Sequence, residues 1–242
     1  MNQEQTSVFG YLENNGTITK ITSIADVEKW LGNIRNGDED MATRIMLMDS
    51  TAKKQHETKS FWKDDNGGEY VPMGAGKGCY LRKGVYGRRA YKTSDYTTVI
   101  GDNAFYNSGD LETIYVSDKV TAIGEYAFGK CHNLVVVRLP LSLKLINTGC
   151  FSDCTALREI VIPEGTLFIE KESFSNCKEL RKITLPGSII GIGDDVFWLC
   201  KELQEICVPN YAFDKIAQML PENLREKIKE IYFFDYDKIF CC

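Results

Sequence analysis

The chain of 242 residues is long enough for one repeat array with its caps or for two small domains. Its 43% hydrophobic and 26% charged content is ordinary for a globular protein, and its formal net charge of −5 disfavours a nucleic-acid-binding function. No apolar run approaches the roughly 18 residues that a membrane span needs, so we expect no membrane span.

The chain starts at Met1 with a polar segment that lacks the basic and apolar regions of a secretory signal peptide. If this sequence is complete, it predicts a cytoplasmic protein. If a signal was removed, the same sequence suits a secreted or cell-surface protein, so the localisation stays open.

Residues 1–96 are expected to form a small α+β segment or an N-terminal cap. Apolar residues recur at helical spacing in residues 25–36, which predicts a helix. The apolar segment Thr43–Met48 predicts a buried strand, and residues 64–68 have the composition of a turn between strands.

Two stretches of this segment allow alternative interpretations. Residues 74–78 are rich in glycine and include Lys77, but no Ser or Thr follows the lysine and no helix pattern follows, which favours a flexible turn over a phosphate-binding loop. Basic residues alternate with tyrosines between Cys79 and Lys92, a pattern that also suits single-stranded nucleic acid. In an acidic chain we favour a solvated strand face or a protein contact there.

From about residue 97 to residue 209, the same residue types recur every 23 positions. The columns are Ile100, Ile123, Ile146, Ile169 and Ile192; Phe105, Phe128, Phe151, Phe174 and Phe197; Leu111, Leu134, Leu157, Leu180 and Leu203; Ile114, Val137, Ile160, Ile183 and Ile206; and Pro140, Pro163, Pro186 and Pro209. A fixed period of this length is typical of stacked-repeat proteins.

The third copy shows how one repeat is expected to fold. Residues 151–154 suit a short helical or 3₁₀ turn, and residues 159–162 alternate outward and inward as a strand does. Pro163 ends the strand because it cannot donate to a ladder. The strands of successive copies should align as one parallel sheet on one face of the array.

Four cysteines form a further column with the same step: Cys131, Cys154, Cys177 and Cys200. We interpret them as small buried core residues. Metal binding and vertical disulfides between neighbouring coils are the alternatives, although a line of sulfurs without a CxxC pair suits a metal poorly. The nine cysteines, which include the terminal pair Cys241 and Cys242, favour a reducing compartment.

The repeat pattern I-x-x-x-x-F-x-x-C-x-x-L-x-x-I-x-L-P is carried in the second copy by Ile123, Phe128, Cys131, Leu134, Val137, Leu139 and Pro140. It resembles the Treponema-type, or BspA-like, leucine-rich repeats over about residues 97–209. The resemblance implies a right-handed solenoid with a strand on one side of each coil. It also implies a role in protein binding or adhesion, mostly in extracellular or surface proteins.

We therefore predict an α+β fold built on a leucine-rich-repeat solenoid. Five 23-residue coils with a parallel sheet on one face would span residues 97–209, between an N-terminal segment of residues 1–96 and a helical cap of residues 210–242. In the cap, Tyr211–Leu220 suits one helix. Pro221 suits the start of a second helix with Leu224, Ile228 and Ile231 on one side. This cap could instead dock another subunit.

The sequence offers little for catalysis. His56 and His132 are its only histidines, and His132 falls at a variable turn position that suits a surface residue. Because no catalytic motif with a nucleophile and its base is present, we expect no enzyme and no catalytic, cofactor or metal site. The remaining enzymatic alternative places an active site in residues 1–96.

Outward strand positions are the candidates for binding, because the repeat does not need them for packing. They form two columns: Thr113, Val136, Glu159, Lys182 and Glu205, and Tyr115, Arg138, Val161, Thr184 and Cys207. We predict that Tyr115, Arg138, Glu159, Val161 and Lys182 form the centre of a surface for a protein partner. The β-branched members also suit a strand for structural reasons alone.

The resulting functional prediction is a non-catalytic protein-binding module. The alternative is a structural subunit of a larger assembly, such as a surface layer or a virion, that uses its edges and termini rather than the strand positions.

Overall fold

The computed structural model describes residues 10–14, 17–21, 45–46, 62–64, 67–72 and 79–232. The chain divides into two compact units, Met1–Thr58 and Lys59–Cys242. The helix expected at residues 25–36 and the glycine-rich segment at residues 74–78 lie outside the described residues.

The first unit contains a small antiparallel sheet. Its central strand β1 (Gly10–Asn14) pairs with β2 (Thr17–Ile21) on one side and with β3 (Ile45–Met46) on the other. The strand predicted at Thr43–Met48 is therefore confirmed at its centre.

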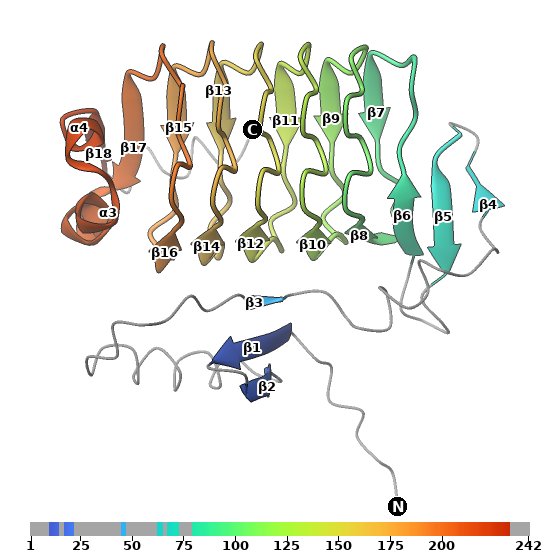
Figure 1. Cartoon of the computed structure of the whole chain (residues 1–242), viewed down its shortest axis with the longest axis horizontal. Coiled ribbons are helices and arrows are strands. Elements are labelled where there is room, and N and C mark those ends of the chain that lie inside the picture. Colours follow the sequence, from blue (N-terminus) through green and yellow to red (C-terminus); the bar gives the residue numbers. More distant parts are fainter. Residues whose placement is uncertain are drawn as a thin grey trace, which may run out of the picture. The chain divides into compact units, whose positions relative to one another are not determined.

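The second unit begins with a hairpin that leads into the repeats. Strand β4 (Trp62–Lys63) pairs antiparallel with β5 (Glu69–Pro72). In the turn predicted between them, the N–H of Gly67 donates to the carbonyl oxygen of Asp64 at 2.8 Å. Strand β6 (Cys79–Lys83) is antiparallel to β5 but parallel to β8 (Thr97–Ile100). The chain thus changes from hairpin to stacked-coil pairing at β6 (Figure 1).

Strands near the end of each repeat stack in parallel, as predicted, but they form two hydrogen-bonded sheets rather than the single sheet that we expected. This strand face consists of β7 (Ala90–Lys92), β9 (Thr113–Tyr115), β11 (Val136–Arg138), β13 (Glu159–Val161), β15 (Lys182–Thr184), β17 (Glu205–Pro209) and β18 (Ile228–Ile231). Paired residues of β7 to β17 stand 23 positions apart, as Thr113 and Val136 do, and those of β17 and β18 stand 22 apart. Because β7 and β18 belong to it, parallel pairing continues past both ends of the expected array of residues 97–209. The coil count and the domain boundaries stay predictions.

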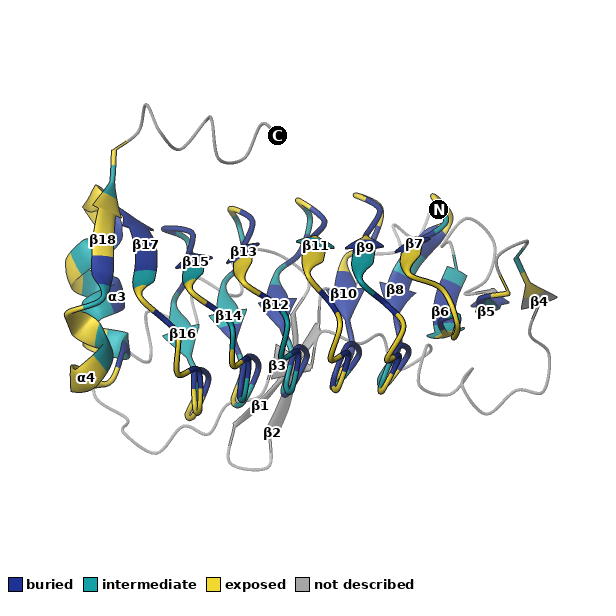
Figure 2. Cartoon of the chain, turned by 90° about the horizontal axis from the view of Figure 1, so that it is seen from above, coloured by how far each residue is buried: buried dark blue, intermediate teal, exposed yellow. Residues whose placement is uncertain are grey.

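A second row of short parallel strands was missed by the sequence analysis. It consists of β8, β10 (Ala122–Ile123), β12 (Leu145–Ile146), β14 (Phe168–Ile169) and β16 (Gly191–Ile192). Figure 2 shows β8, β10 and β12 as mostly buried segments of this row. Four of these strands have only two residues, so they are too short to show the alternation that reveals a strand in a sequence.

The phenylalanine column forms a continuous stack inside the array. Neighbouring ring centroids are 5.2, 5.3, 5.4 and 6.0 Å apart from Phe105 to Phe197, and the rings are nearly parallel. The backbone follows the same step, because the N–H of Phe128 donates to the carbonyl oxygen of Cys150 at 2.9 Å and that of Phe151 to Ser173 at 2.8 Å. One coil cannot bury its own apolar side, but stacked coils can.

The turns that carry this stack need left-handed backbone at fixed places. The residues two before each phenylalanine have positive φ, from 52° to 58°: Asn103, Tyr126, Gly149, Glu172 and Asp195. Non-glycine residues rarely adopt this conformation, so the turn is held by its repeated hydrogen bonds rather than by local preference.

The N-terminal end of the phenylalanine stack is closed by tyrosines. The ring of Tyr91 packs edge-on against Phe105 at 5.3 Å, and its hydroxyl lies 2.7 Å from that of Tyr70. Both hydroxyls donate to Asp64 Oδ2 at 3.1–3.2 Å. Desolvation by burial raises the pKa of both tyrosines above the ordinary value, which keeps these hydroxyls as donors.

The C-terminal end is closed by a 3₁₀ turn, η1 (Asn210–Ala212), and by two helices, α3 (Phe213–Met219) and α4 (Glu222–Arg225). The predicted first helix is confirmed. The second helix was predicted too long, because it stops at Arg225 and Ile228–Ile231 form strand β18 instead. Parallel pairing to β17 satisfies the backbone of that segment, and Ile228 pairs with Ile206 at the edge of the strand face.

We expect Phe151→Ala to lower the free energy of unfolding by about 3–5 kcal/mol, because the ring is fully buried between two others and its removal leaves a cavity. Urea unfolding followed by circular dichroism measures this. The matched control is Tyr96→Ala, whose ring is 73% exposed and which should change stability by no more than about 0.5 kcal/mol. Equal effects of the two variants would show that the stack does not stabilise the array.

Candidate functional site

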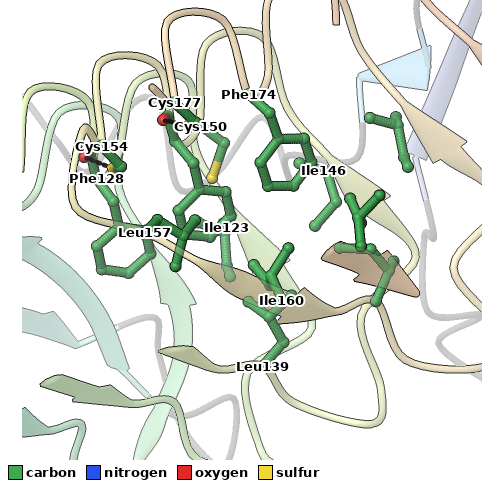
Figure 3. Close-up of a cluster of buried hydrophobic side chains, with 14 of the residues drawn as sticks. Ile123, Phe128, Leu139, Ile146, Cys150, Cys154, Leu157, Ile160, Phe174 and Cys177 are labelled. Carbon is green, nitrogen blue, oxygen red and sulfur yellow. Dashed lines mark hydrogen bonds between the residues drawn. The ribbon is translucent and has the colours of Figure 1, made fainter. Parts of the chain in front are cut away.

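The cysteine column is part of the core. Each thiol is buried, and each Sγ donates to the carbonyl oxygen of the phenylalanine 26 residues earlier, at 3.0–3.2 Å for Cys131, Cys154, Cys177 and Cys200. Figure 3 shows this bond between Cys154 and Phe128. Desolvation raises the pKa of Cys131 to about 12. The seven cysteines of the described chain are free thiols, which confirms the buried-thiol interpretation for this column.

The two histidines and the potential metal ligands were the other candidates from the sequence. His132 is exposed, and its Nδ1 lies 3.0 Å from the carbonyl oxygen of Asp153. Among these residues there is no group of three His, Cys, Asp or Glu side chains that could hold a metal ion. His56 lies outside the described residues.

The basic and aromatic stretch between Cys79 and Lys92 does not present a row of stacking rings. Tyr80 and Tyr91 are buried, and Arg89 pairs with Glu112 at 2.7 Å. The stretch forms β6 and β7, so Tyr80 and Tyr91 serve the core. Tyr86 is exposed, and the ammonium group of Lys83 lies over its ring at 5.3 Å.

The strand face holds the five predicted partner-binding residues. Tyr115, Arg138 and Glu159 are exposed, and Val161 and Lys182 are half-buried. Two further positions were wrongly predicted to be outward-facing, because Thr184 and Cys207 are only 2% and 3% exposed. The strand alternation that suggested exposure holds for the first copies but not for β15 and β17.

A groove brings four of the five predicted residues together. Its cavity volume is about 450 Å³, and it is lined by Tyr115, Val135, Val136, Val137, Arg138, Leu139, Leu141, Glu159, Ile160, Val161 and Pro163. Lys182 does not line it and instead lies 4.0 Å from Glu205. The sequence analysis missed Val135 and Leu141, although the run of three valines and a leucine after Pro140 could have signalled apolar side chains without a place in the core.

Arg138 lines the groove, and Asp118 holds its guanidinium group. Arg138 Nη2 donates to Asp118 Oδ2 at 3.1 Å, and the backbone N–H of Leu141 donates to Asp118 Oδ1 at 3.3 Å. Desolvation acts to raise the pKa of Asp118, but these hydrogen bonds outweigh it and lower the pKa below its ordinary value. Asp118 therefore stays ionised and positions the guanidinium beside the groove.

The groove lies where the strand face is interrupted. Strands β7, β9 and β11 form one hydrogen-bonded sheet, and β13, β15, β17 and β18 form another. In Figure 1 the arrows of β11 and β13 stand farther apart than those of β9 and β11. The lining residues come from both sides of this interruption, which is the junction between the second and third copies.

A second cavity, of about 770 Å³, lies where the last coil meets the C-terminal helices. Its lining includes Asp194, Asp195, Trp198, Leu220 and Leu224. The indole of Trp198 is 58% exposed there, but none of the predicted binding residues lies in this cavity.

The sequence model of the BspA type leucine rich repeat region matches residues 98–233 in six copies. The chain belongs to this family. A search of curated protein sequences finds no match.

Solved structures agree with this assignment. A leucine rich cell surface protein from Faecalibacterium prausnitzii superimposes with a TM-score of 0.61 and 25% identity, over 65% of this chain and 42% of that one. A T. pallidum leucine-rich repeat protein gives 0.56 and 26%, over 58% and 68%. The pneumococcal vaccine antigen PcpA gives 0.54 and 18%, over 71% and 46%, which shows the fold alone. This chain thus spans less than half of the Faecalibacterium protein.

Membership in this repeat family points to a protein-binding module, since leucine-rich repeats typically bind proteins rather than catalyse reactions. In the described part of the chain, no helix is long and apolar enough to cross a membrane.

We expect stability to fall as pH rises from about 8 to 9.5. The unfolded chain ionises its thiols above about pH 8.5, whereas burial keeps Cys131 and Cys154 protonated in the folded state. The unfolded state then binds fewer protons, so the free energy of unfolding decreases with pH. Urea unfolding midpoints across this pH range measure the loss of stability. In a second measurement, iodoacetamide should leave both thiols unlabelled until the protein unfolds. Labelling of either thiol in the folded protein would contradict the assignment.

Proposed function

We propose that the chain is a non-catalytic module that binds a protein partner on its strand face, with Tyr115, Arg138, Glu159 and Val161 at the centre of the contact and Lys182 at its rim. The observation that carries the proposal is the groove, which gathers four of these five side chains on one exposed surface.

The composition of this surface supports a binding role. Tyr115, Val135, Val136 and Leu141 are 41–57% exposed and all line one groove. Exposed apolar side chains that cluster in this way mark interaction sites, whereas single ones are ordinary. A partner that covers them would remove apolar area from water at about 25 cal/mol per Å².

Two side chains are suited to act as anchors. Tyrosine and arginine are enriched among residues that carry binding energy, and Tyr115 and Arg138 occupy paired positions on β9 and β11. Because Asp118 already holds Arg138, the guanidinium loses little conformational freedom on binding.

The location of the F. prausnitzii relative, a cell surface protein, supports a similar setting for this chain under the proposal. In that setting the partner would be another protein met at the surface of a cell. The competing proposal, a structural subunit of a surface layer or virion, would protect the sheet edges and the termini instead of the groove.

We expect the double variant Tyr115→Ala/Arg138→Ala to weaken partner binding by about 30-fold or more, because two anchors of about 1–2 kcal/mol each are removed. The partner is first captured with the whole chain from its native source and identified by mass spectrometry. Its dissociation constant is then measured by calorimetry.

The matched control is Tyr96→Ala/Arg89→Ala, which removes an exposed tyrosine and an ion-paired arginine away from the groove. It should change the dissociation constant less than about twofold. Unchanged binding by the groove variant, or footprinting that protects only edges and termini, would contradict the proposal and favour the structural subunit.

A further inference from the structure

The junction between the second and third copies lacks main-chain hydrogen bonds that the other junctions make. The N–H of Val116 donates to Arg138, that of Ile162 to Thr184, and that of Leu185 to Cys207, each at 2.9 Å. The equivalent pair here is the N–H of Leu139 and the carbonyl oxygen of Val161. Neither has a hydrogen-bond partner within the described residues.

A main-chain hydrogen bond is also missing at the N-terminal end of β11 and β13. The N–H of Val136 donates to Glu112 at 3.0 Å, and that of Lys182 to Arg158 at 3.2 Å. Between the second and third copies this bond would join the N–H of Glu159 to the carbonyl oxygen of Val135. It is absent in the described chain, so β11 and β13 each present an unpaired edge to the groove.

The second row of strands opens at the same junction. The N–H groups of Gly124, Glu170 and Gly193 donate to the preceding coil at 2.7–2.8 Å. In the third copy the side chain takes over this role, because Asn147 Nδ2 donates to the carbonyl oxygen of Ile123 at 2.6 Å. A side-chain amide reaches farther than a backbone N–H group. Its use here indicates that these two coils stand farther apart on this side.

The phenylalanine stack and the turns that carry it, together called the turn column, stay in contact across this junction. The rings of Phe128 and Phe151 stack at 5.3 Å, and the N–H of Tyr126 donates to Thr148 at 3.0 Å. The two halves of the array are therefore joined at the turns and separated at the strands. The gap is a wedge whose wide side is the groove.

Ion pairs show the same discontinuity. Arg89–Glu112, Arg158–Glu179 and Lys182–Glu205 link neighbouring copies elsewhere on the strand face. No ion pair within the described residues joins the second copy to the third, and Glu159 at this edge has none.

We propose that an extended segment of a protein partner enters the wedge between β11 and β13 and completes its hydrogen-bond ladder. This rests on the proposed function and specifies its binding mode, which is strand addition. The partner supplies main-chain donors and acceptors to the open edges. Its inward side chains are apolar, to contact Val137 and Ile160, and a Lys or Arg lies beside Glu159.

Strand addition requires β11 and β13 to move apart, because some of their Cα atoms lie within 8 Å of one another. A strand between β11 and β13 needs about 9.6 Å between them, twice the usual 4.8 Å strand spacing. The closed turn column keeps the two halves in register while the strand side widens. Binding then gives hydrogen-bond partners to the main-chain groups that β11 and β13 leave unpaired.

The test uses a fluorescein-labelled peptide with the sequence of residues 180–186, Leu-Arg-Lys-Ile-Thr-Leu-Pro. In this chain that segment already pairs with the far edge of β13 and places Lys182 beside Glu159. Fluorescence anisotropy with the whole protein should show saturable binding. A peptide with three N-methylated backbone nitrogens keeps the side chains but loses the donors, and should bind at least 10-fold more weakly.

A disulfide staple tests the location. The disulfide of oxidised Val136→Cys/Glu159→Cys closes the wedge, so this form should bind the peptide at least 10-fold more weakly than the same variant after reduction. The control staple Ala90→Cys/Thr113→Cys joins strands that are already paired, at residues outside the groove lining, and should change binding less than twofold. Both are confirmed by mass spectrometry before use.

Absence of peptide binding to the wild-type protein, equal binding of the N-methylated peptide, or equal effects of the two staples would overturn the inference. Binding of the captured partner to the same variants distinguishes failure of strand addition from failure of the proposed function. If Tyr115→Ala/Arg138→Ala weakens that partner but the wedge staple does not, the strand face binds by side chains alone and strand addition is wrong.

Discussion

The array depends on the packing of the turn column, which combines ring stacking with backbone hydrogen bonds between successive coils. From Phe105 to Phe197 the rings lie in one stack, and a backbone hydrogen bond accompanies each step from coil to coil. The left-handed residues beside each ring are unfavourable alone and persist because these contacts repeat. Tyr91 covers the first ring and the C-terminal helices follow the last coil, so the column has an N-terminal and a C-terminal closure.

Because the turn column is continuous, the strand face can be interrupted without dividing the array. The copies stay in step through Phe128 and Phe151 even where β11 and β13 do not pair. The interruption leaves apolar side chains and open main-chain groups beside a fixed Arg138. Under our proposals the structural repeat provides the scaffold, and the local departure from it provides the binding surface.

The sequence predicted what depends on the 23-residue period. The phenylalanine and cysteine columns and the strand at Glu159–Val161 follow from this period. The hairpin before the repeats was predicted separately, from the composition of its turn. The two-residue strands could not be predicted, because two residues are too few to show an alternation that repeats every second residue. Nor could the burial of Cys207 or the strand at Ile228–Ile231, since both depend on neighbours beyond the repeat. Four of the five candidate binding residues meet in the groove, but the interruption that forms it leaves no periodic signal.

Residue-resolved amide hydrogen exchange tests the central claim most directly. The account predicts slow exchange for Val116, Ile162 and Leu185, whose N–H groups bond to the next coil, and for Phe128 and Phe151 in the turn column. It predicts fast exchange for Leu139 and Glu159 at the open junction. Equal protection of Leu139 and Val116 would show that the strand face is continuous and would contradict the account.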